Sequence, residues 1–303
     1  MPAAGTMTAP RPALSIVMPA LEEHAGLAKL LPQLRALHPE AELIVVDDGS
    51  RSPLAPLAAA HGARCLRHPY PMGNGAAVKS GARAAAAPVV VFMDADGQHD
   101  PTDVARLLAR LGSGFDMVVG ARRAGSHAST GRRLANALYN WFGGWMVNQR
   151  IDDLTSGFRA VRAVRFTEFL HLLPNGFSYP TTITMAFFRA GYAVGYEPIV
   201  AARREGRSHI RPLRDGLRFL IIILKVGTLY SPLKLFLPLS ALLFTTGLGY
   251  YAYTYLESAR FTNMSALLLS VSVLTFLIGL VSDQVTTLMY MQAASHRERH
   301  DDR

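Results

Sequence analysis

Two aspartates at the end of an apolar run are the residues best placed to do chemistry. Residues 89–92 read Val-Val-Val-Phe, and Asp94, Ala95, Asp96 and Gln98 follow at once. Such a run, bounded by polar turn residues, predicts a buried central strand. Side chains two positions apart on an extended chain point the same way, so the carboxylates can offer oxygen ligands together. We predict that Asp94, Asp96 and Gln98 bind Mg²⁺ or Mn²⁺ carrying a diphosphate. A strand-ending turn with solvated acids is the alternative.

Other residue types suit the remaining parts of a phosphorylated ligand. Asp47 and Asp48 end an earlier apolar run, and carboxylates in that position commonly accept hydrogen bonds from ribose or base groups. Gly73 and Gly75 precede a predicted helix, where they can leave backbone N–H groups open to an anion. Lys79 adds positive charge to that helix, although a solvated helix face explains it equally well.

Apolar runs that alternate with helical patterns must position these residues. Predicted strands are residues 14–19, 42–46, 64–67, 89–92, 116–119 and 196–200. Predicted helices are residues 22–37, 53–61, 76–87, one from about 100, 134–146 and 181–190, with a turn-rich segment at 152–159. This alternation predicts an α/β domain with a mostly parallel sheet, Rossmann-like in its crossovers. Ligands bind beyond the carboxyl ends of such strands, so we expect Pro19, Asp47, Asp48, Asp94 and Asp96 at one edge.

Composition limits the partners. The chain has 31 Lys and Arg against 22 Asp and Glu, a net charge of +9, which favours phosphate groups, nucleic acid or acidic lipid. Nucleic-acid binding explains neither the Asp94 strand nor the long apolar segments, so we expect no nucleic-acid partner. The single cysteine, Cys65, excludes an intrachain disulfide and a cysteine-rich zinc site. Residues 1–12 lack the apolar core of a secretory signal and are predicted to be a disordered lead-in.

Two long apolar segments predict a membrane anchor. Residues 235–256 carry no charge, and the segment from 263 to about 291 carries none before Asp283. Each is long enough to cross the ~30 Å hydrocarbon core, so we predict a two-helix transmembrane hairpin over residues 233–292. The basic, amphipathic segment 210–232 is expected to lie on an anionic membrane surface as juxtamembrane helices.

The basic residues on both sides of the hairpin predict its orientation. By the positive-inside tendency, the tail at 293–303 and the domain at 13–209 face the cytoplasm. We therefore expect a multi-pass protein of the inner (cytoplasmic) membrane whose α/β domain is cytoplasmic. A homo-oligomer is compatible with this arrangement.

Five short motifs stand in an order that resembles a known family. They are Pro-Ala-Leu-Glu-Glu at 19–23, Val-Asp-Asp-Gly-Ser at 46–50, the Gly-rich segment 73–81, Asp-Ala-Asp-Gly-Gln at 94–98 and Asp-Leu-Thr-Ser-Gly-Phe-Arg at 153–159. Together they resemble the inverting family 2 glycosyltransferases of GT-A fold. More narrowly, they are similar to the branch that loads a sugar onto a polyprenyl phosphate, such as dolichol-phosphate mannose synthases and undecaprenyl-phosphate glucosyltransferases. The resemblance covers about residues 14–208.

The resemblance implies roles for individual residues. The nucleotide-sugar is expected to contact Pro19, Leu21, Glu23, Asp47, Asp48, Lys79, Asp94, Ala95, Asp96, Arg203 and Ser208. The segment from Arg203 to Ser208 is similar to a loop that closes over the phosphates, but His209 replaces the usual lysine. The acceptor phosphate is expected to contact Arg122, Arg132 and Arg133. Asp96, Asp153 and Arg133 are the candidate catalytic residues.

A missing acid bears on the reaction. Residues 169–196 contain no Asp or Glu, whereas relatives that glycosylate a hydroxyl carry a base in this part of the fold. A phosphate monoester is already anionic at pH 7 and can attack an anomeric carbon unaided. We therefore predict hexose transfer, with inversion, from UDP-glucose or GDP-mannose to a polyprenyl phosphate, an EC 2.4.1-type reaction. Asp152 or Asp153 stays the exception that could act as a base.

Two alternatives remain open. One is a membrane-bound transferase that acts on a hydroxyl of a glycolipid or polysaccharide, which predicts more spans and a catalytic acid after Ser156. The other is a non-catalytic membrane scaffold, which predicts loss of the metal-binding carboxylates. Asp94, Asp96 and Gln98 are all present, so this alternative ranks lower.

Overall fold

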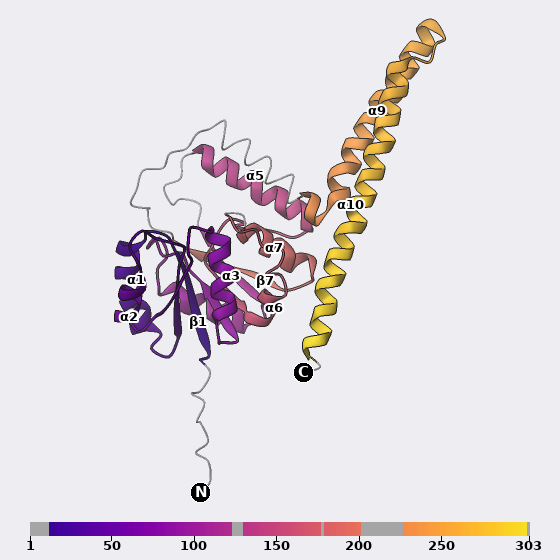
Figure 1. Cartoon of the computed structure of the whole chain (residues 1–303). Helices are drawn as coiled ribbons and strands as arrows, with labels where there is room; N and C mark the ends of the chain where they lie inside the picture. The colour runs from indigo at the N-terminus through magenta and orange to yellow at the C-terminus, as the bar shows by residue number, and fades with distance from the viewer. Residues whose placement is uncertain (1–11, 123–129, 177–178, 201–226, 302–303) are drawn as a thin grey trace. The chain divides into compact units, whose positions relative to one another are not determined.

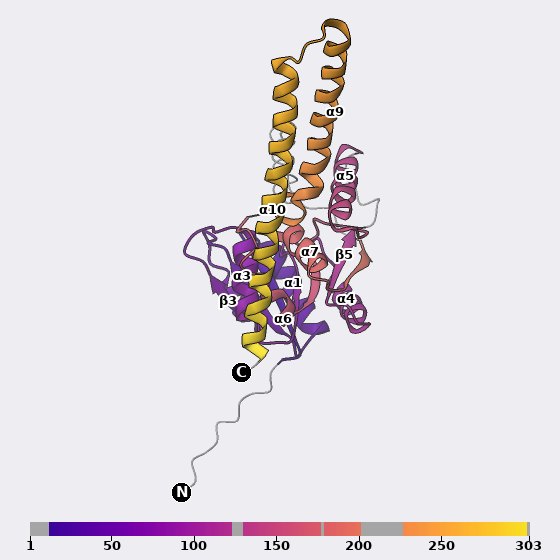
Figure 2. The same cartoon turned by 90° about the vertical axis from the view of Figure 1, so that its right-hand side faces the viewer.

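The computed structural model describes residues 12–122, 130–176, 179–200 and 227–301. The chain divides into two compact units, which are considered one at a time. The first comprises residues 1–140 and 151–208, and the second comprises residues 141–150 and 209–303. Figures 1 and 2 show the described elements from two directions.

The first unit is built on one seven-stranded sheet. Its strands are β1 (Leu14–Ala20), β2 (Glu42–Asp47), β3 (Arg64–Arg67), β4 (Val89–Phe92), β5 (Met117–Arg122), β6 (Arg159–Arg162) and β7 (Val194–Ile199), in the order β3-β2-β1-β4-β6-β5-β7. Only β6 runs antiparallel to its neighbours, β4 and β5. The other strands therefore end at one edge, as predicted.

Helices cover both faces of this sheet. They are α1 (His24–Leu37), α2 (Ala55–Ala60), α3 (Asn74–Ala84), α4 (Asp103–Gly112), α6 (Ala163–Thr167) and α7 (Tyr179–Arg189). Helix α5 (Thr130–Val147) begins in the first unit and ends in the second. Ile16 and Met18 of β1 share an apolar core with the inward faces of α1 and α4. Val17 points the other way and meets Gly81 of α3. Successive strand residues thus bury opposite faces, which explains why these strands are apolar throughout.

The structure differs from the sequence-based expectation at 159–167. Only residues 152–159 were predicted to be turn-rich, and no element was predicted for 160–167, but residues 159–167 form β6 and the short helix α6. Strand β6 reads Arg-Ala-Val-Arg, so two apolar residues are too few to show a strand period. The strand forms because Arg159 pairs with Phe92 and Val161 pairs with Met117, which fills the gap between β4 and β5.

The second unit contains two long apolar helices, α9 (Pro232–Ser258) and α10 (Asn263–Asp301). Pro232–Ser258 and Asn263–Met289 are each long and apolar enough to cross a membrane, and only 11% and 17% of their most apolar windows are buried. The buried positions of α10 among residues 263–289 recur every seventh residue and are small: Ser265, Ser272, Gly279 and Thr286. Of these, Ser272 and Gly279 meet α9 directly. Ser240 and Ser272 each donate to the other's backbone carbonyl, at 2.9 and 3.1 Å.

Candidate active site

The predicted strand-end residues come together at the carboxyl edge of the sheet. Pro19 pairs with Val46 at the end of β1 and β2, and Ala20 pairs with Asp47. The segment that follows β4 begins beside them, because the Met93 N–H donates to the Val17 carbonyl at 3.0 Å. Since β6 is antiparallel, the segment leading into it from Asp153 reaches the same edge. The sheet therefore gathers four chain segments that are distant in sequence.

The segment after β4 is packed tightly on both sides. A Cβ added to Gly26 of α1 would lie 2.0 Å from the Ala95 carbonyl oxygen, and one added to Gly157 would lie 2.9 Å from Asp94 Oδ2. Ala95 is buried, whereas Asp94 and Asp96 are half-buried. Asp96 Oδ1 accepts the Gln98 N–H at 3.1 Å, which shapes the turn. Glycines on both sides thus allow the chain to press against these carboxylates.

His99 is a site neighbour that the sequence did not single out. Its ring is buried and stacks on Phe158 with centroids 4.8 Å apart. Its Nε2 lies 3.7 Å from Asp94 Oδ2, while its buried Nδ1 has no hydrogen-bond partner among the residues that the structure describes. Only its position directly after Gln98 could have indicated from the sequence that His99 lies at the site.

The oxygen donors fit a hard divalent ion that is shared with a substrate. Mg²⁺ and Mn²⁺ at phosphate sites use one or two carboxylates and leave other positions to water and phosphate oxygens. Asp94 and Asp96 supply two half-buried carboxylates, and Gln98 can add an amide oxygen. Within the described residues, no three His, Cys, Asp or Glu side chains gather closely enough to enclose an ion by themselves. An ion here would therefore depend on a ligand such as a diphosphate.

Asp47 is a structural residue of its turn. Its carboxylate is fully buried and accepts the backbone N–H groups of Ser50 at 2.8 Å and Leu54 at 3.3 Å. Burial favours the neutral acid, but these hydrogen bonds and the nearby charge of Arg67 outweigh it and lower the pKa of Asp47. The Asp47 carboxylate therefore stabilises the turn that follows β2.

Asp48 organises the loop between β3 and α3. Its Oδ1 accepts from His68 Nδ1 at 2.7 Å and from the Met72 N–H at 2.9 Å, while Oδ2 accepts the Gly73 N–H at 2.8 Å. His68 Nε2 in turn lies 2.9 Å from Ser80 Oγ. The carboxylate has about four acceptor positions, so this network leaves room for about one further hydrogen bond from a ligand.

The start of α3 contacts protein oxygens. The Gly73 N–H is bonded to Asp48, and the Ala76 N–H donates to the Asn175 carbonyl at 3.1 Å. Lys79 Nζ donates to the Leu173 carbonyl at 3.0 Å and to Asn175 Oδ1 at 2.5 Å. Two N–H groups at the predicted anion site and the Lys79 ammonium are thus bonded to the protein's own oxygens.

The segments after β1 and β2 are fastened to each other. Glu22 has a left-handed φ of 59°, which costs a non-glycine residue free energy. Its N–H donates to Ser50 Oγ at 3.0 Å, and its carboxylate accepts the Arg51 N–H at 2.7 Å. These two bonds fix the positions of Leu21, which is exposed, and Glu23, which begins α1.

Arg122 and Asp153 form the strongest ion pair at this edge. Arg122 Nε and Nη2 donate to the two Asp153 oxygens at 2.8 and 3.0 Å, and Nη2 also donates to Thr155 Oγ1 at 2.5 Å. Asp153 Oδ1 accepts the Ser156 N–H as well. Burial works to raise the pKa of Asp153, but the hydrogen bonds and charge of Arg122 prevail and lower it. An anion held this firmly is a weak general base.

A second arginine is buried behind this pair. Arg159 is fully buried and donates to the Ser156 and Pro180 carbonyls and to Thr184 Oγ1. Burial lowers its pKa because the charged form loses its hydration. These contacts fix the segment of Ser156 and Gly157 that faces Asp94.

Several predicted residues lie beyond what the structure describes. Arg203 and Ser208 fall within residues 201–226, outside the described residues, as does most of the predicted juxtamembrane segment. Arg132 and Arg133 belong to the first turns of α5, where only the backbone is described.

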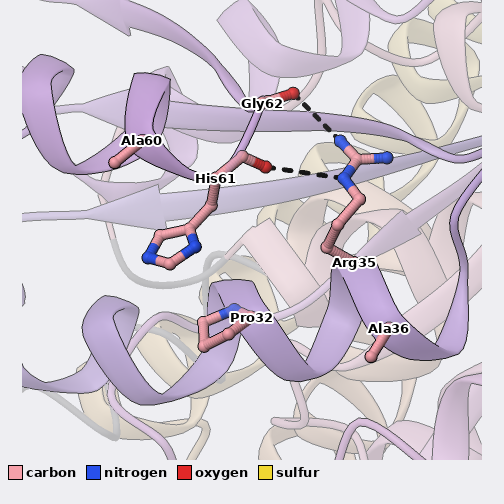
Figure 3. A pocket seen from close by; sticks show the side chains of 6 residues that line it. All are labelled: Pro32, Arg35, Ala36, Ala60, His61 and Gly62. Carbon is pink, nitrogen blue, oxygen red and sulfur yellow. Dashed lines mark hydrogen bonds between the residues drawn. The ribbon is translucent and has the colours of Figure 1, made fainter.

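An open pocket lies elsewhere on the first unit. It measures about 540 Å³ and is lined by Pro32, Arg35, Ala36, Ala60, His61 and Gly62 (Figure 3). These residues lie near the C-terminal ends of α1 and α2, shortly before β2 and β3 begin. The pocket is therefore at the amino edge of the sheet. Arg35 donates to the His61 and Gly62 carbonyls there. The pocket is therefore separate from the candidate active site.

Known proteins of similar sequence match this chain over part or nearly all of its length. Uncharacterized glycosyltransferases of Mycobacterium tuberculosis and Mycobacterium bovis are 37% identical over 43% of this chain, an alignment that covers 58% of their length. Glycosyltransferase AglJ of Haloferax volcanii is 27% identical over 95% of this chain and 96% of its own. Undecaprenyl-phosphate mannosyltransferase of Micrococcus luteus is 28% identical over 62% of this chain and 83% of its own.

Solved structures support the fold. Glucosyl-3-phosphoglycerate synthase of Mycobacterium tuberculosis, bound to phosphoglyceric acid, matches with a TM-score of 0.56 at 23% identity over 71% of this chain and 80% of that one. The same enzyme in complex with Mn²⁺, UDP and phosphoglyceric acid matches with a TM-score of 0.53 at 27% identity, over 71% and 77% of the two chains.

Family models cover both units. Residues 231–288 match the GtrB C-terminal hairpin, which spans α9 and most of α10. Residues 15–166, half of the chain, match the family described as Glycosyl transferase family 2. This match includes the strand-end segments with Asp48, Asp94, Asp96 and Asp153. The chain belongs to glycosyl transferase family 2.

Proposed function

We propose that this protein transfers a hexose, with inversion, from a nucleotide-sugar to the phosphate of a membrane-bound polyprenyl phosphate. The observation that carries the proposal is the Arg122–Asp153 ion pair, whose guanidinium lies near enough to Asp94 to feel its charge. This edge offers a fixed cation to a phosphate, while the buried carboxylate that could have acted as a base is held by hydrogen bonds. That combination suits an acceptor that arrives already ionised. The similarity to the undecaprenyl-phosphate mannosyltransferase of Micrococcus luteus supports the same acceptor class.

The proposed reaction needs no proton transfer to begin. An oxygen of the acceptor phosphate attacks the anomeric carbon, and the bond from that carbon to the nucleoside diphosphate breaks with its electron pair. The products are polyprenyl-phosphate sugar and nucleoside diphosphate. A divalent ion bound by Asp94, Asp96 and Gln98 would offset the charge of the diphosphate.

The chain's own residues bring two anions together. Arg122 presents a guanidinium whose orientation is set by Asp153 and Thr155, and its pKa is raised by the hydrogen bonds and charge of Asp153. Arg132 and Arg133 are proposed to add positive charge for the acceptor phosphate, as are Arg203 and Ser208 for the donor phosphates. Pro19, Leu21, Glu23 and Asp48 are proposed to border the nucleotide.

The hairpin is proposed to hold the catalytic unit at the membrane that contains the lipid acceptor. The two helices α9 and α10 would cross the inner membrane and leave the catalytic unit in the cytoplasm, where nucleotide-sugars are made. UDP-glucose and GDP-mannose are the proposed donors. A hydroxyl acceptor remains the competing function because both reactions use the same donor edge.

One experiment separates these functions. Membranes that contain the protein are incubated with labelled UDP-glucose or GDP-mannose, with and without added undecaprenyl phosphate, and with Mn²⁺ or EDTA. The proposal expects label in a lipid extract only when undecaprenyl phosphate is present, with release by mild acid as expected of a sugar phosphate. Acid-stable label that does not depend on undecaprenyl phosphate would favour the hydroxyl acceptor. Asp96→Ala is the matched control.

A further inference from the structure

Both tryptophans of this chain lie on one exposed face of α5. Trp141 is 63% exposed, Trp145 is 39% exposed, and Leu138, three residues before Trp141, is 53% exposed. Residues three and four positions apart share one side of a helix, so the three side chains form a single apolar stripe. Tyr139 and Met146, on other sides of the helix, are buried. This stripe is called the tryptophan face.

The C-terminal end of α5 is fastened to the beginning of α9. Lys234 Nζ donates to the carbonyls of Trp145 at 2.8 Å and Met146 at 3.1 Å, and to Asn148 Oδ1 at 2.7 Å. Ser231 Oγ donates to the Met146 carbonyl at 3.0 Å. The last carbonyls of a helix have no partners within it, and a lysine is well suited to satisfy them. The end of α5 is therefore held where a candidate membrane span begins.

This position has a chemical consequence. A helix that crosses a bilayer enters it through the headgroup region, so side chains fastened to its first turn lie near that boundary. Tryptophan is enriched there because its ring is apolar while its N–H can still reach water or headgroups. Large apolar side chains on an amphipathic helix are expected to insert between headgroups and acyl chains.

We propose that the tryptophan face of α5 lies in the headgroup–acyl boundary of the bilayer crossed by α9 and α10. The proposal rests on the membrane placement of the hairpin in the proposed function, and not on the transfer reaction. It gives the protein a membrane contact between β5 and β6 in addition to the hairpin.

The two tryptophans make the test direct, because they are the only ones in the chain. The full-length protein is reconstituted in bilayers of phosphatidylethanolamine and phosphatidylglycerol whose acyl chains carry bromine either near the headgroup or near the chain end. We expect blue-shifted tryptophan emission, strong quenching by bromine near the headgroup, weaker quenching by bromine near the chain end, and little quenching by acrylamide in the water. Trp141→Phe and Trp145→Phe each leave one reporter.

Two reference variants calibrate the depth. Both variants are made in the Trp141→Phe/Trp145→Phe background. Leu242→Trp puts the reporter at an exposed position of α9, and Val164→Trp puts it at an exposed position of α6. The first is expected to respond to bromine near the chain end, which also checks that the hairpin is inserted. The second is expected to respond to acrylamide.

Two results would overturn the proposal. Native tryptophans that are quenched by acrylamide and not by bromine would show that the face is in water. Tryptophans shielded from both quenchers would show that another protein surface covers the face. Neither readout requires sugar transfer, so an inactive preparation still tests the membrane contact, and failed transfer leaves the result unchanged.

Discussion

Arg122 and Asp153 meet at the carboxyl edge of the sheet, where the Arg122 Nε and Nη2 atoms donate to the two carboxylate oxygens of Asp153 at 2.8 and 3.0 Å. Arg122 ends β5, and Asp153 begins the segment that leads into the neighbouring strand β6. The pair therefore joins two adjacent chain segments. It gives Asp153 a role in orienting an arginine, where the sequence had allowed a general base.

The first prediction separates these two roles. Asp153→Asn removes the charge that orients Arg122, and a lost charge-assisted hydrogen bond costs about 1.5–3 kcal/mol. We expect the KM for undecaprenyl phosphate to rise about tenfold or more, with a smaller change in kcat and in the KM for the nucleotide-sugar. Steady-state kinetics measure all three. A general base would instead lose about 10²–10⁴ in kcat with little change in acceptor KM. Asp152→Asn is the neighbouring control.

The second prediction concerns pH and stability. The pKa of Asp153 is lower in the folded protein than its ordinary value of about 3.9. A lowered folded-state pKa contributes stability that is fully present above about pH 4 and is lost as pH falls through the folded-state value. Below pH 4, we expect the denaturant midpoint of unfolding to decrease more steeply with falling pH for the wild type than for Asp153→Asn. Parallel curves for the two proteins would show that Asp153 does not contribute.

The third prediction concerns the divalent ion. Asp96→Ala is expected to abolish transfer and to remove the binding of Mn²⁺ in the presence of nucleoside diphosphate, measured by electron paramagnetic resonance. Its unfolding midpoint should stay close to that of the wild type, because Asp96 is half-buried. EDTA should stop wild-type transfer, and Mn²⁺ or Mg²⁺ should restore it. Transfer by the variant at the wild-type rate would exclude Asp96 as a ligand.

Alternation of apolar runs was enough to predict the sheet and the edge at which Asp94 and Asp96 lie. It could not predict β6, because that strand forms only by pairing with β4 and β5, which lie elsewhere in the chain. The hydrogen-bond partners of Asp48 and Asp153 were equally hidden. His68 lies 20 residues from Asp48, and Arg122 lies 31 residues from Asp153. Such pairs depend on which strands become neighbours, and spacing along the chain carries no signal for them.

The fourth prediction tests the packing that supports the Asp94–Asp96 segment. Gly26→Ala puts a methyl group 2.0 Å from a backbone oxygen of Ala95, so α1 or this segment must move. We expect a loss of about 1–3 kcal/mol in the free energy of unfolding, together with a lower transfer rate. Gly112→Ala, at the end of α4, meets no atom within 4 Å and should be neutral or stabilise by up to about 1 kcal/mol. Denaturant unfolding compares the two variants, and equal free energies would argue against this packing.

The last prediction concerns the hairpin, where two glycines offer a matched pair. A Cβ at Gly279 of α10 would lie 2.7 Å from the Cβ of Phe236 on α9, whereas one at Gly249 would meet no atom within 4 Å. Gly279→Leu must therefore push the helices apart, and overpacking of this kind costs about 1–3 kcal/mol. Gly249→Leu adds an apolar side chain on an open surface, so it should leave the hairpin intact. Heating each variant in detergent and measuring the folded fraction by gel filtration should show an earlier loss for Gly279→Leu. The same midpoint for both variants would mean that the helices do not pack along the seam of Ser265, Ser272, Gly279 and Thr286.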